Sequence, residues 1–188
     1  LLAAVNETTN NTSTSTSDDA SVSASEIDDT GRGGGGGGGA GAAATHTQVV
    51  DAMGVRQVWR SGVRGGGVRV AVFDTGLRAG HPHFKRVREV TNWTDERALD
   101  DALGHGTFVA GVVAGGEASC AGLAPDADLH IYRVFTSGRV SYTAWFLDAM
   151  NYAIHTEIDV LNLSIGGPDF LDRPFVEKVW ELSANNIV

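Results

Sequence analysis

The chain has 188 residues, of which 42% are hydrophobic, and its formal net charge is −9. This length suits one domain, or one domain with a tail, and the acidic balance argues against a nucleic-acid-binding protein, which is usually basic. A single cysteine, Cys120, supports neither a disulfide framework nor a zinc site. No apolar run is long enough to predict a transmembrane helix.

Residues 1–48 are predicted to be a disordered, low-complexity tail or linker. The stretch consists almost entirely of Ser, Thr, Asn, Asp, Ala and Gly, contains no aromatic residue, and includes an unbroken glycine run at 33–39. Such a segment cannot bury enough apolar surface to offset the conformational entropy that folding removes. The foldable unit is therefore predicted at 49–188.

From residue 49 onward, stretches with helical spacing alternate with strand-like stretches. The predicted order is a helix at 50–60, a buried strand at 68–73, an irregular region at 77–104, a helix at 107–114, a strand at 129–135, a helix from an N-cap at Ser141 to His155, a strand at 160–165, a helix at 173–184, and the first residues of a further strand at 187–188. This alternation predicts an α/β fold with three layers, in which a mostly parallel sheet has helices on both faces.

Two motifs place acid–base groups at the ends of these elements. Asp74 directly follows the first buried strand, in Asp-Thr-Gly, and His105 opens a predicted helix within Gly-His-Gly-Thr. Functional groups gather at the carboxyl ends of strands in open α/β sheets, and an ionised carboxylate near a core needs a partner such as an imidazole N–H. We therefore expect Asp74 to contact His105. In enzymes with a serine nucleophile, such an imidazole takes the serine proton and the carboxylate fixes its tautomer.

Other chemistries fit these residues less well. Asp-Thr-Gly is also the motif of aspartic proteases, but those enzymes pair two copies and this chain has one. His81, His83 and Asp74 could suggest a metal site, but His-Pro-His on a loop lacks the geometry of common zinc sites, so no metal site is predicted. The glycines around His105 lack the third glycine of the dinucleotide-binding fingerprint.

In combination and in this order, the segments 70–76, 104–111 and 161–167 resemble the subtilases, the subtilisin-like serine proteases of peptidase family S8. Further similarity, notably at 81–84, 92–94 and 159–170, is to the site-1 protease subgroup, and the resemblance covers about 55–188. It implies a subtilisin-like fold, a serine endopeptidase of the secretory pathway (endoplasmic reticulum or Golgi), and roles for Asp74 as catalytic aspartate and His105 as general base.

The resemblance also implies where a substrate would lie. Ser164, Ile165 and Gly166 match the strand that lines the primary specificity pocket, while Gly138 and Val140 fall in the segment that flanks the substrate on the opposite side. A protein or peptide substrate would then bind as an added β-strand. No cofactor is predicted with certainty; structural calcium is implied only by the family. Membrane association would come only through segments outside this chain.

Two family motifs do not occur in the sequence: the Gly-Thr-Ser-x-Ala motif with the nucleophilic serine, and the downstream asparagine that donates to the oxyanion. We therefore expect the chain to be the N-terminal part of the catalytic domain, truncated before these motifs. The parent protein would be the endopeptidase and the chain as written would lack normal turnover, since each missing group costs orders of magnitude in rate. The alternative is a catalytically inactive, peptide-binding module, and the sequence leaves both open.

Overall fold

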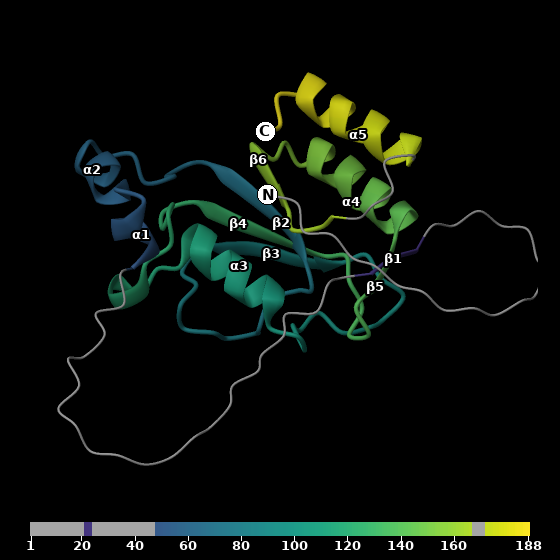
Figure 1. Ribbon diagram of the computed structural model, residues 1–188, viewed down its shortest axis with the longest axis horizontal. Helices are drawn as coiled ribbons and strands as arrows, with labels where there is room; N and C mark the ends of the chain where they lie inside the picture. Colours follow the sequence, from purple (N-terminus) through teal and green to yellow (C-terminus); the bar gives the residue numbers. More distant parts are fainter. Residues whose placement is uncertain (1–20, 24–47, 167–171) are drawn as a thin grey trace, which may run out of the picture.

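A central parallel sheet organises the fold of the protein, for which we describe a computed structural model (Figure 1). The structure describes residues 21–23, 48–166 and 172–188, so most of the predicted tail lies outside the described residues. The sheet has four strands in the order β3-β4-β2-β6, and every neighbouring pair is parallel. The strands are β2 (Arg69–Asp74), β3 (Val87–Asn92), β4 (Asp128–Arg133) and β6 (Val160–Leu163).

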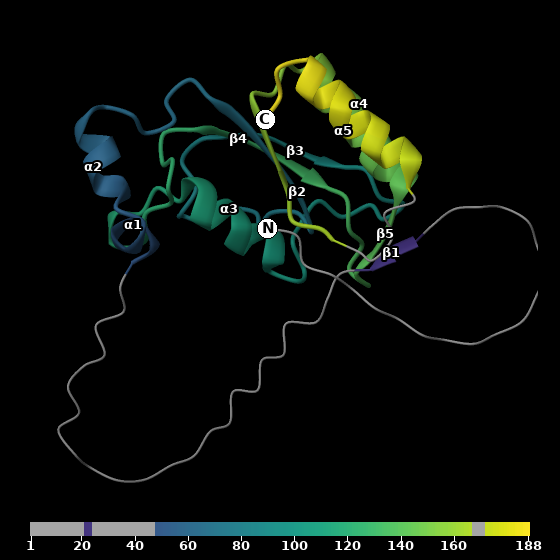
Figure 2. The same cartoon turned by 45° about the horizontal axis from the view of Figure 1, so that its top comes forward.

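Helices cover both faces of the sheet because its central strands carry apolar residues on both sides. Ala71 and Phe73 of β2 pack into one core with α4 (Thr143–His155) and α5 (Arg173–Ala184), whereas Val70 and Val72 pack into a second core with α3 (His105–Ala114). Figures 1 and 2 accordingly show α3 on one side of the sheet and the α4–α5 pair on the other. The predicted three-layer α/β architecture is confirmed for the described residues.

Two predicted elements in the first half of the domain are wrong. The helix predicted at 50–60 is two short helices, α1 (Val49–Ala52) and α2 (Val55–Arg60), because Gly54 between them adopts a left-handed φ of 67° that interrupts the helix. The region 77–104 is not wholly irregular, since it contains the edge strand β3. That strand carries Arg88 and Glu89 among its apolar residues, so its sequence lacks the continuous apolar run of a central strand.

Two boundaries in the second half also differ from the prediction. Ser141 is not the N-cap of α4; it lies in the short strand β5 (Val140–Tyr142), and its hydroxyl donates to the carbonyl of Val134. Tyr142 precedes the helix instead, with an extended backbone and no side-chain cap. The strand predicted at 160–165 ends at Leu163, whose pairing with Phe73 is the last between β6 and β2.

The remaining described segments attach to these layers. Strand β1 (Ser21–Ser23), within the predicted tail, pairs antiparallel with β5, and Ala118–Cys120 form the 3-10 helix η1. At 187–188 no strand is assigned, but the amide of Val188 donates to Asp159 (3.1 Å) and its carbonyl accepts from Leu161 (2.8 Å). These two bonds follow the pattern of a parallel ladder alongside β6.

Candidate active site

The carboxylate of Asp74 closes strand β2 and is almost completely buried, with 1% of the residue exposed. Its Oδ1 accepts a hydrogen bond from the amide of Thr75 at 2.8 Å and lies 2.7 Å from Nδ1 of His105. Its Oδ2 accepts no hydrogen bond from any residue in the described part of the chain. A buried carboxylate requires compensation, and here the imidazole is its one side-chain partner among those residues.

The imidazole of His105 stands at the first position of α3, where its side chain is 37% exposed. Because Nδ1 donates to the carboxylate, Nε2 is the ring nitrogen left to exchange a proton with another group. The hydrogen bond to Asp74 raises the pKa of His105 above its ordinary value; burial opposes this shift, and the negative charges of Asp74 and Asp101 reinforce it. The pair therefore has the geometry of the acid–base half of a serine-protease triad.

Helix α3 approaches Asp74 closely because residue 106 has no side chain. A Cβ atom at Gly106 would lie 2.3 Å from the carbonyl oxygen of Gly76 and 3.2 Å from Cβ of Asp74. In place of a side chain, the amide of Gly106 donates to the hydroxyl of Thr75 at 2.9 Å. The glycine after His105 is thus required for the contact between the helix and the end of β2.

A second buried carboxylate, Asp101, was not among the residues singled out from the sequence. It accepts hydrogen bonds from Thr75 and from three residues around the start of α3, namely Leu103, Gly104 and Thr107. Burial alone would raise the pKa of Asp101, but the hydrogen bonds, led by those from Thr107, hold it below the ordinary value. The only sequence signal was the dipeptide Asp100-Asp101, which does not indicate which carboxylate is buried.

Sequence reasoning also missed Arg133, a buried cation at the end of β4 that pairs in register with Asp74. Its guanidinium donates to the carbonyl of Thr75 (3.2 Å) and to the carbonyl of Ala98 (2.6 Å), and forms an ion pair with Glu96. Arg133 therefore connects the loop that follows Asp74 with the segment that leads to His105. A lone arginine in an apolar strand gave no indication of this role.

The predicted substrate-binding residues lie at the same carboxyl edge of the sheet. Ser164, Ile165 and Gly166 follow β6 directly, just beyond its last pair with β2, Phe73↔Leu163. They are not part of the strand itself, contrary to the sequence prediction, and the hydroxyl of Ser164 accepts from the side chain of Asn162 at 2.8 Å.

The opposite predicted segment follows β4. Gly138 is exposed in the turn before β5, and Val140 is the first residue of that strand, 37% exposed. This segment is tied to the active-site edge through Val134, whose amide donates to the carbonyl of Asp74 at 2.9 Å and whose carbonyl accepts from Ser141. The structure thus collects both predicted substrate-binding segments around the end of β2.

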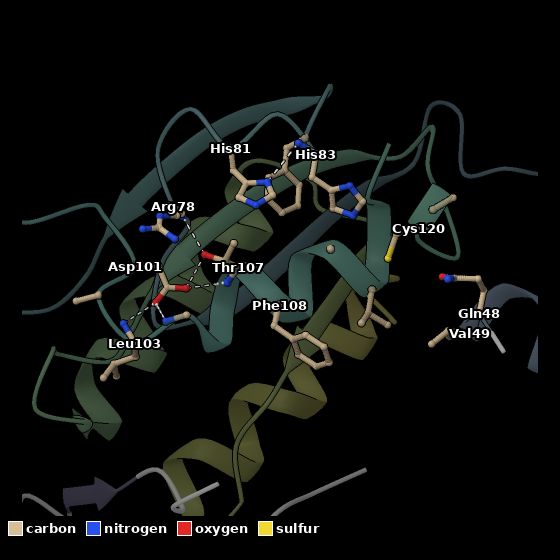
Figure 3. Close-up of a pocket in the computed structure, with 16 residues that line it drawn as sticks. Gln48, Val49, Arg78, His81, His83, Asp101, Leu103, Thr107, Phe108 and Cys120 are labelled. Atoms are coloured by element: carbon tan, nitrogen blue, oxygen red, sulfur yellow. Dashed lines mark hydrogen bonds between the residues drawn. The ribbon is translucent and has the colours of Figure 1, made fainter. Parts of the chain in front are cut away.

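A pocket of about 540 Å³ lies against the outer side of α3, next to the Asp74–His105 pair but not lined by it. Figure 3 shows His81, His83 and Phe108 around this pocket, with the Asp101 hydrogen bonds at one end.

Among residues 48–166 and 172–188, no group of three or more His, Cys, Asp or Glu side chains is placed to hold a metal ion. None of the described helices is long and apolar enough to cross a bilayer.

Comparison with known proteins relates this geometry to one enzyme family. The subtilase family matches residues 65–187. The chain is 66% identical over 141 residues to the human (Homo sapiens) membrane-bound transcription factor site-1 protease, covering 75% of this chain and 13% of that protein. It is 60% identical over 142 residues to the Arabidopsis thaliana subtilisin-like protease SBT6.1, covering 76% and 14%. The major intracellular serine protease of Bacillus subtilis is 38% identical over 140 residues, covering 69% and 43%.

The chain thus spans about an eighth of the length of the site-1 proteases that it matches and less than half of the bacterial enzyme. The matched region contains both members of the Asp74–His105 pair, the central sheet and the three helices that cover it. On the family match and the identity to these proteases, the chain belongs to the subtilase family.

Proposed function

We propose that the parent protein is a serine endopeptidase in which Asp74 and His105 serve as the catalytic aspartate and the general base. The observation that carries this proposal is the 2.7 Å contact between a buried carboxylate and a partly exposed imidazole at the carboxyl edge of a parallel sheet. The family match and the serine proteases among the relatives support it.

In this reaction Nε2 of His105 takes the proton of the serine nucleophile and later returns it to the leaving amine. Asp74 accepts from Nδ1, which holds the ring in the required tautomer and stabilises the imidazolium; it does not itself take the proton. The raised pKa of His105 fits this role because the same interaction makes the imidazole a stronger base. The nucleophile is contributed by a part of the enzyme outside these 188 residues.

We propose further that a protein or peptide substrate binds as an extended strand between the two segments at the end of β2. One side is the stretch Ser164, Ile165 and Gly166, and the other is formed by Gly138 and Val140. Support comes from β5, whose edge takes an antiparallel strand in this structure: Ser23 of β1 lies opposite Val140 and Ser21 lies opposite Tyr142. Main-chain hydrogen bonds of this kind supply affinity with little dependence on sequence.

The finer assignment is to the site-1 protease type, working in the endoplasmic reticulum or Golgi. It is supported by 66% identity to a protein named a membrane-bound transcription factor site-1 protease and by 60% identity to a plant subtilisin-like protease. Any membrane attachment would then come from parts of the parent protein outside this chain. Expression of the tagged full-length protein, followed by imaging with Golgi and endoplasmic-reticulum markers, tests the location.

The catalytic assignment is tested by expressing the full-length protein and measuring hydrolysis of a peptide library with wild type, His105→Ala and the control His155→Ala. His155 is exposed at the end of α4, away from the pair. We expect kcat/KM to fall by at least about a thousandfold for His105→Ala and to change little for His155→Ala. Undiminished hydrolysis by His105→Ala would refute the role of this residue.

The second candidate function is peptide binding without turnover, which the β1–β5 pairing favours because an edge that takes a strand does not require chemistry. Measuring peptide binding alongside hydrolysis, with the same proteins and the same library, separates the two functions. A wild-type protein that binds library peptides but hydrolyses none of them would support the binding module and exclude the endopeptidase.

A further inference from the structure

We propose that Asp101 is a positioning residue for the Asp74–His105 pair: its buried carboxylate ties the start of α3 to the loop that follows β2. This inference rests on the proposed function, since it assigns a role within the same catalytic site. Asp101 touches neither the substrate segments nor the imidazole by a hydrogen bond, so it would act through its neighbours.

Asp101 is buried, with 7% of the residue exposed, and both of its carboxylate oxygens accept hydrogen bonds. Oδ1 accepts from the hydroxyl of Thr75 (2.8 Å), the amide of Gly104 (2.8 Å) and the amide of Leu103 (3.1 Å). Oδ2 accepts from the amide and the hydroxyl of Thr107, at 2.8 and 2.6 Å. Figure 3 shows the bonds from Leu103 and from Thr107, in the first turn of the helix, converging on Asp101.

The bonds to the backbone replace a cap that the helix lacks. Gly104 occupies the N-cap position of α3 and has no side chain with which to accept from the first turn. Asp101 reaches forward instead and accepts from Thr107, at the third helical position, where an N-cap side chain would normally accept. Since Gly104 and Thr107 both bond to Asp101, the backbone is held on both sides of His105.

Thr75 completes a second connection, from Asp101 to the catalytic carboxylate. Its hydroxyl donates to Asp101 and accepts from the amide of Gly106 at 2.9 Å, while its own amide donates to Asp74 at 2.8 Å. Asp101 is therefore linked to Asp74 through one residue and to His105 through the residues that flank it. A carboxylate at the junction of these two links fixes the distance between acid and base.

The charge of Asp101 has an effect separate from its hydrogen bonds. After the hydrogen bond with Asp74, the negative charges of Asp74 and Asp101 both contribute to raising the pKa of His105. An isosteric neutral residue at position 101 should therefore lower the pKa of His105, and it should also hold the backbone around His105 less firmly. A residue that served only to cap α3 would change stability without this effect on the base.

The test uses the full-length protein and compares Asp101→Asn with Asp100→Asn. Asp100 is the matched control: it is adjacent and exposed, and within the described part of the chain its carboxylate accepts only from the amide of Ala79 (3.0 Å). For Asp101→Asn we expect kcat to fall by roughly ten- to a hundredfold, as a misplacement of about 1 Å would produce, with KM changed less than about threefold. The acid limb of the pH profile of kcat/KM should move to lower pH. Asp100→Asn should leave both unchanged.

A second pair of variants keeps the test decisive if Asp101→Asn does not fold. Thr75→Val removes only the hydroxyl that joins Asp101 to Gly106, and Thr75→Ser restores it. We expect kcat to fall with valine and to recover with serine, at equal folded fraction by circular dichroism. A wild-type kcat in both Asp101→Asn and Thr75→Val overturns the proposal. The proposal is also overturned if activity falls only in proportion to the folded fraction and the acid limb of the pH profile stays where it is in the wild type. An inactive wild type would instead count against the proposed function.

Discussion

The substitution Gly106→Ala tests directly how the site is assembled, because a single methyl group would occupy the space through which α3 meets β2. The added Cβ would lie 2.3 Å from the carbonyl oxygen of Gly76, whereas such carbon–oxygen contacts are rarely closer than about 3.3 Å. The helix must therefore move by about 1 Å. The three nearest neighbours of the new atom are two backbone atoms of Gly76 and the β-carbon of Asp74, so no flexible side chain can give way.

A displacement of this size is expected to lengthen the 2.7 Å contact between His105 and Asp74. A misplacement of about 1 Å costs on the order of a hundredfold in rate, so kcat/KM should fall by about that factor. Stability should fall as well, because overpacking costs about 1–3 kcal/mol. The usual gain of about 1 kcal/mol from replacing glycine by alanine in a helix interior offsets only part of that cost.

Gly111→Ala is the matched control, since it adds the same methyl group to the same helix. Its nearest contact would be Cδ2 of His83 at 3.4 Å, an ordinary van der Waals distance. We expect this variant to keep wild-type kcat/KM and to melt at the same or a slightly higher temperature. Measurement of peptide hydrolysis and thermal unfolding for both variants decides the matter. The reasoning is refuted if Gly106→Ala stays within threefold of wild-type activity and is as stable as Gly111→Ala.

Four further outcomes are expected. Because the hydrogen bond to Asp74 raises the pKa of His105, kcat/KM should keep rising with pH beyond the ordinary histidine value of about 6.5, and Asp74→Asn should move this limb to lower pH. The raised pKa of His105 also stabilises the folded state. This contribution is fully present at pH values below the pKa that His105 has in the unfolded chain, and it is lost as pH rises through the pKa in the folded state. Urea unfolding at a series of pH values would show the loss. Arg133→Met leaves the buried backbone carbonyl of Thr75 without its guanidinium donor, at about 1–3 kcal/mol, measurable by denaturant titration; an unchanged midpoint would contradict this. Met150→Ala in the core should cost about 2–5 kcal/mol, whereas Met53→Ala, at a 65% exposed position, should change stability by less than about 0.5 kcal/mol.

Much of the central fold could be predicted from local pattern. Strand β2 has a nearly unbroken run of apolar, β-branched residues, and α4 repeats apolar residues along one face, as Phe146, Met150 and Ala153 show. Both were found within a residue or two of their observed bounds. The edge strand β3 was missed because Arg88 and Glu89 interrupt its apolar pattern; only pairing with β4 makes it a strand.

The candidate site divides in the same way. Asp74 and His105 could be recognised because each stands in a short motif at the end of an element. Asp74 is followed by Thr and Gly after β2, and His105 lies between two glycines at the start of α3. Asp101 could not, since Asp100 beside it has the same side chain and a similar local setting. Which of the two aspartates is buried depends on the positions of Thr75 and Thr107 in the folded chain. Thr75 is far from Asp101 in the sequence, and Thr107 lies beyond the turn that leads into α3.

The sequence by itself determined the alternation of strands and helices and singled out Asp74 and His105 as the candidate acid–base pair, because side-chain periodicity and short motifs are properties of neighbouring residues. The tertiary structure alone decided that Asp74 and His105, 31 residues apart, meet at 2.7 Å. It also selected Asp101 as the buried carboxylate and Arg133 as the buried cation between loops. Such contacts depend on how closely α3 can pack against the end of β2, and that approach is set by the missing side chain at Gly106.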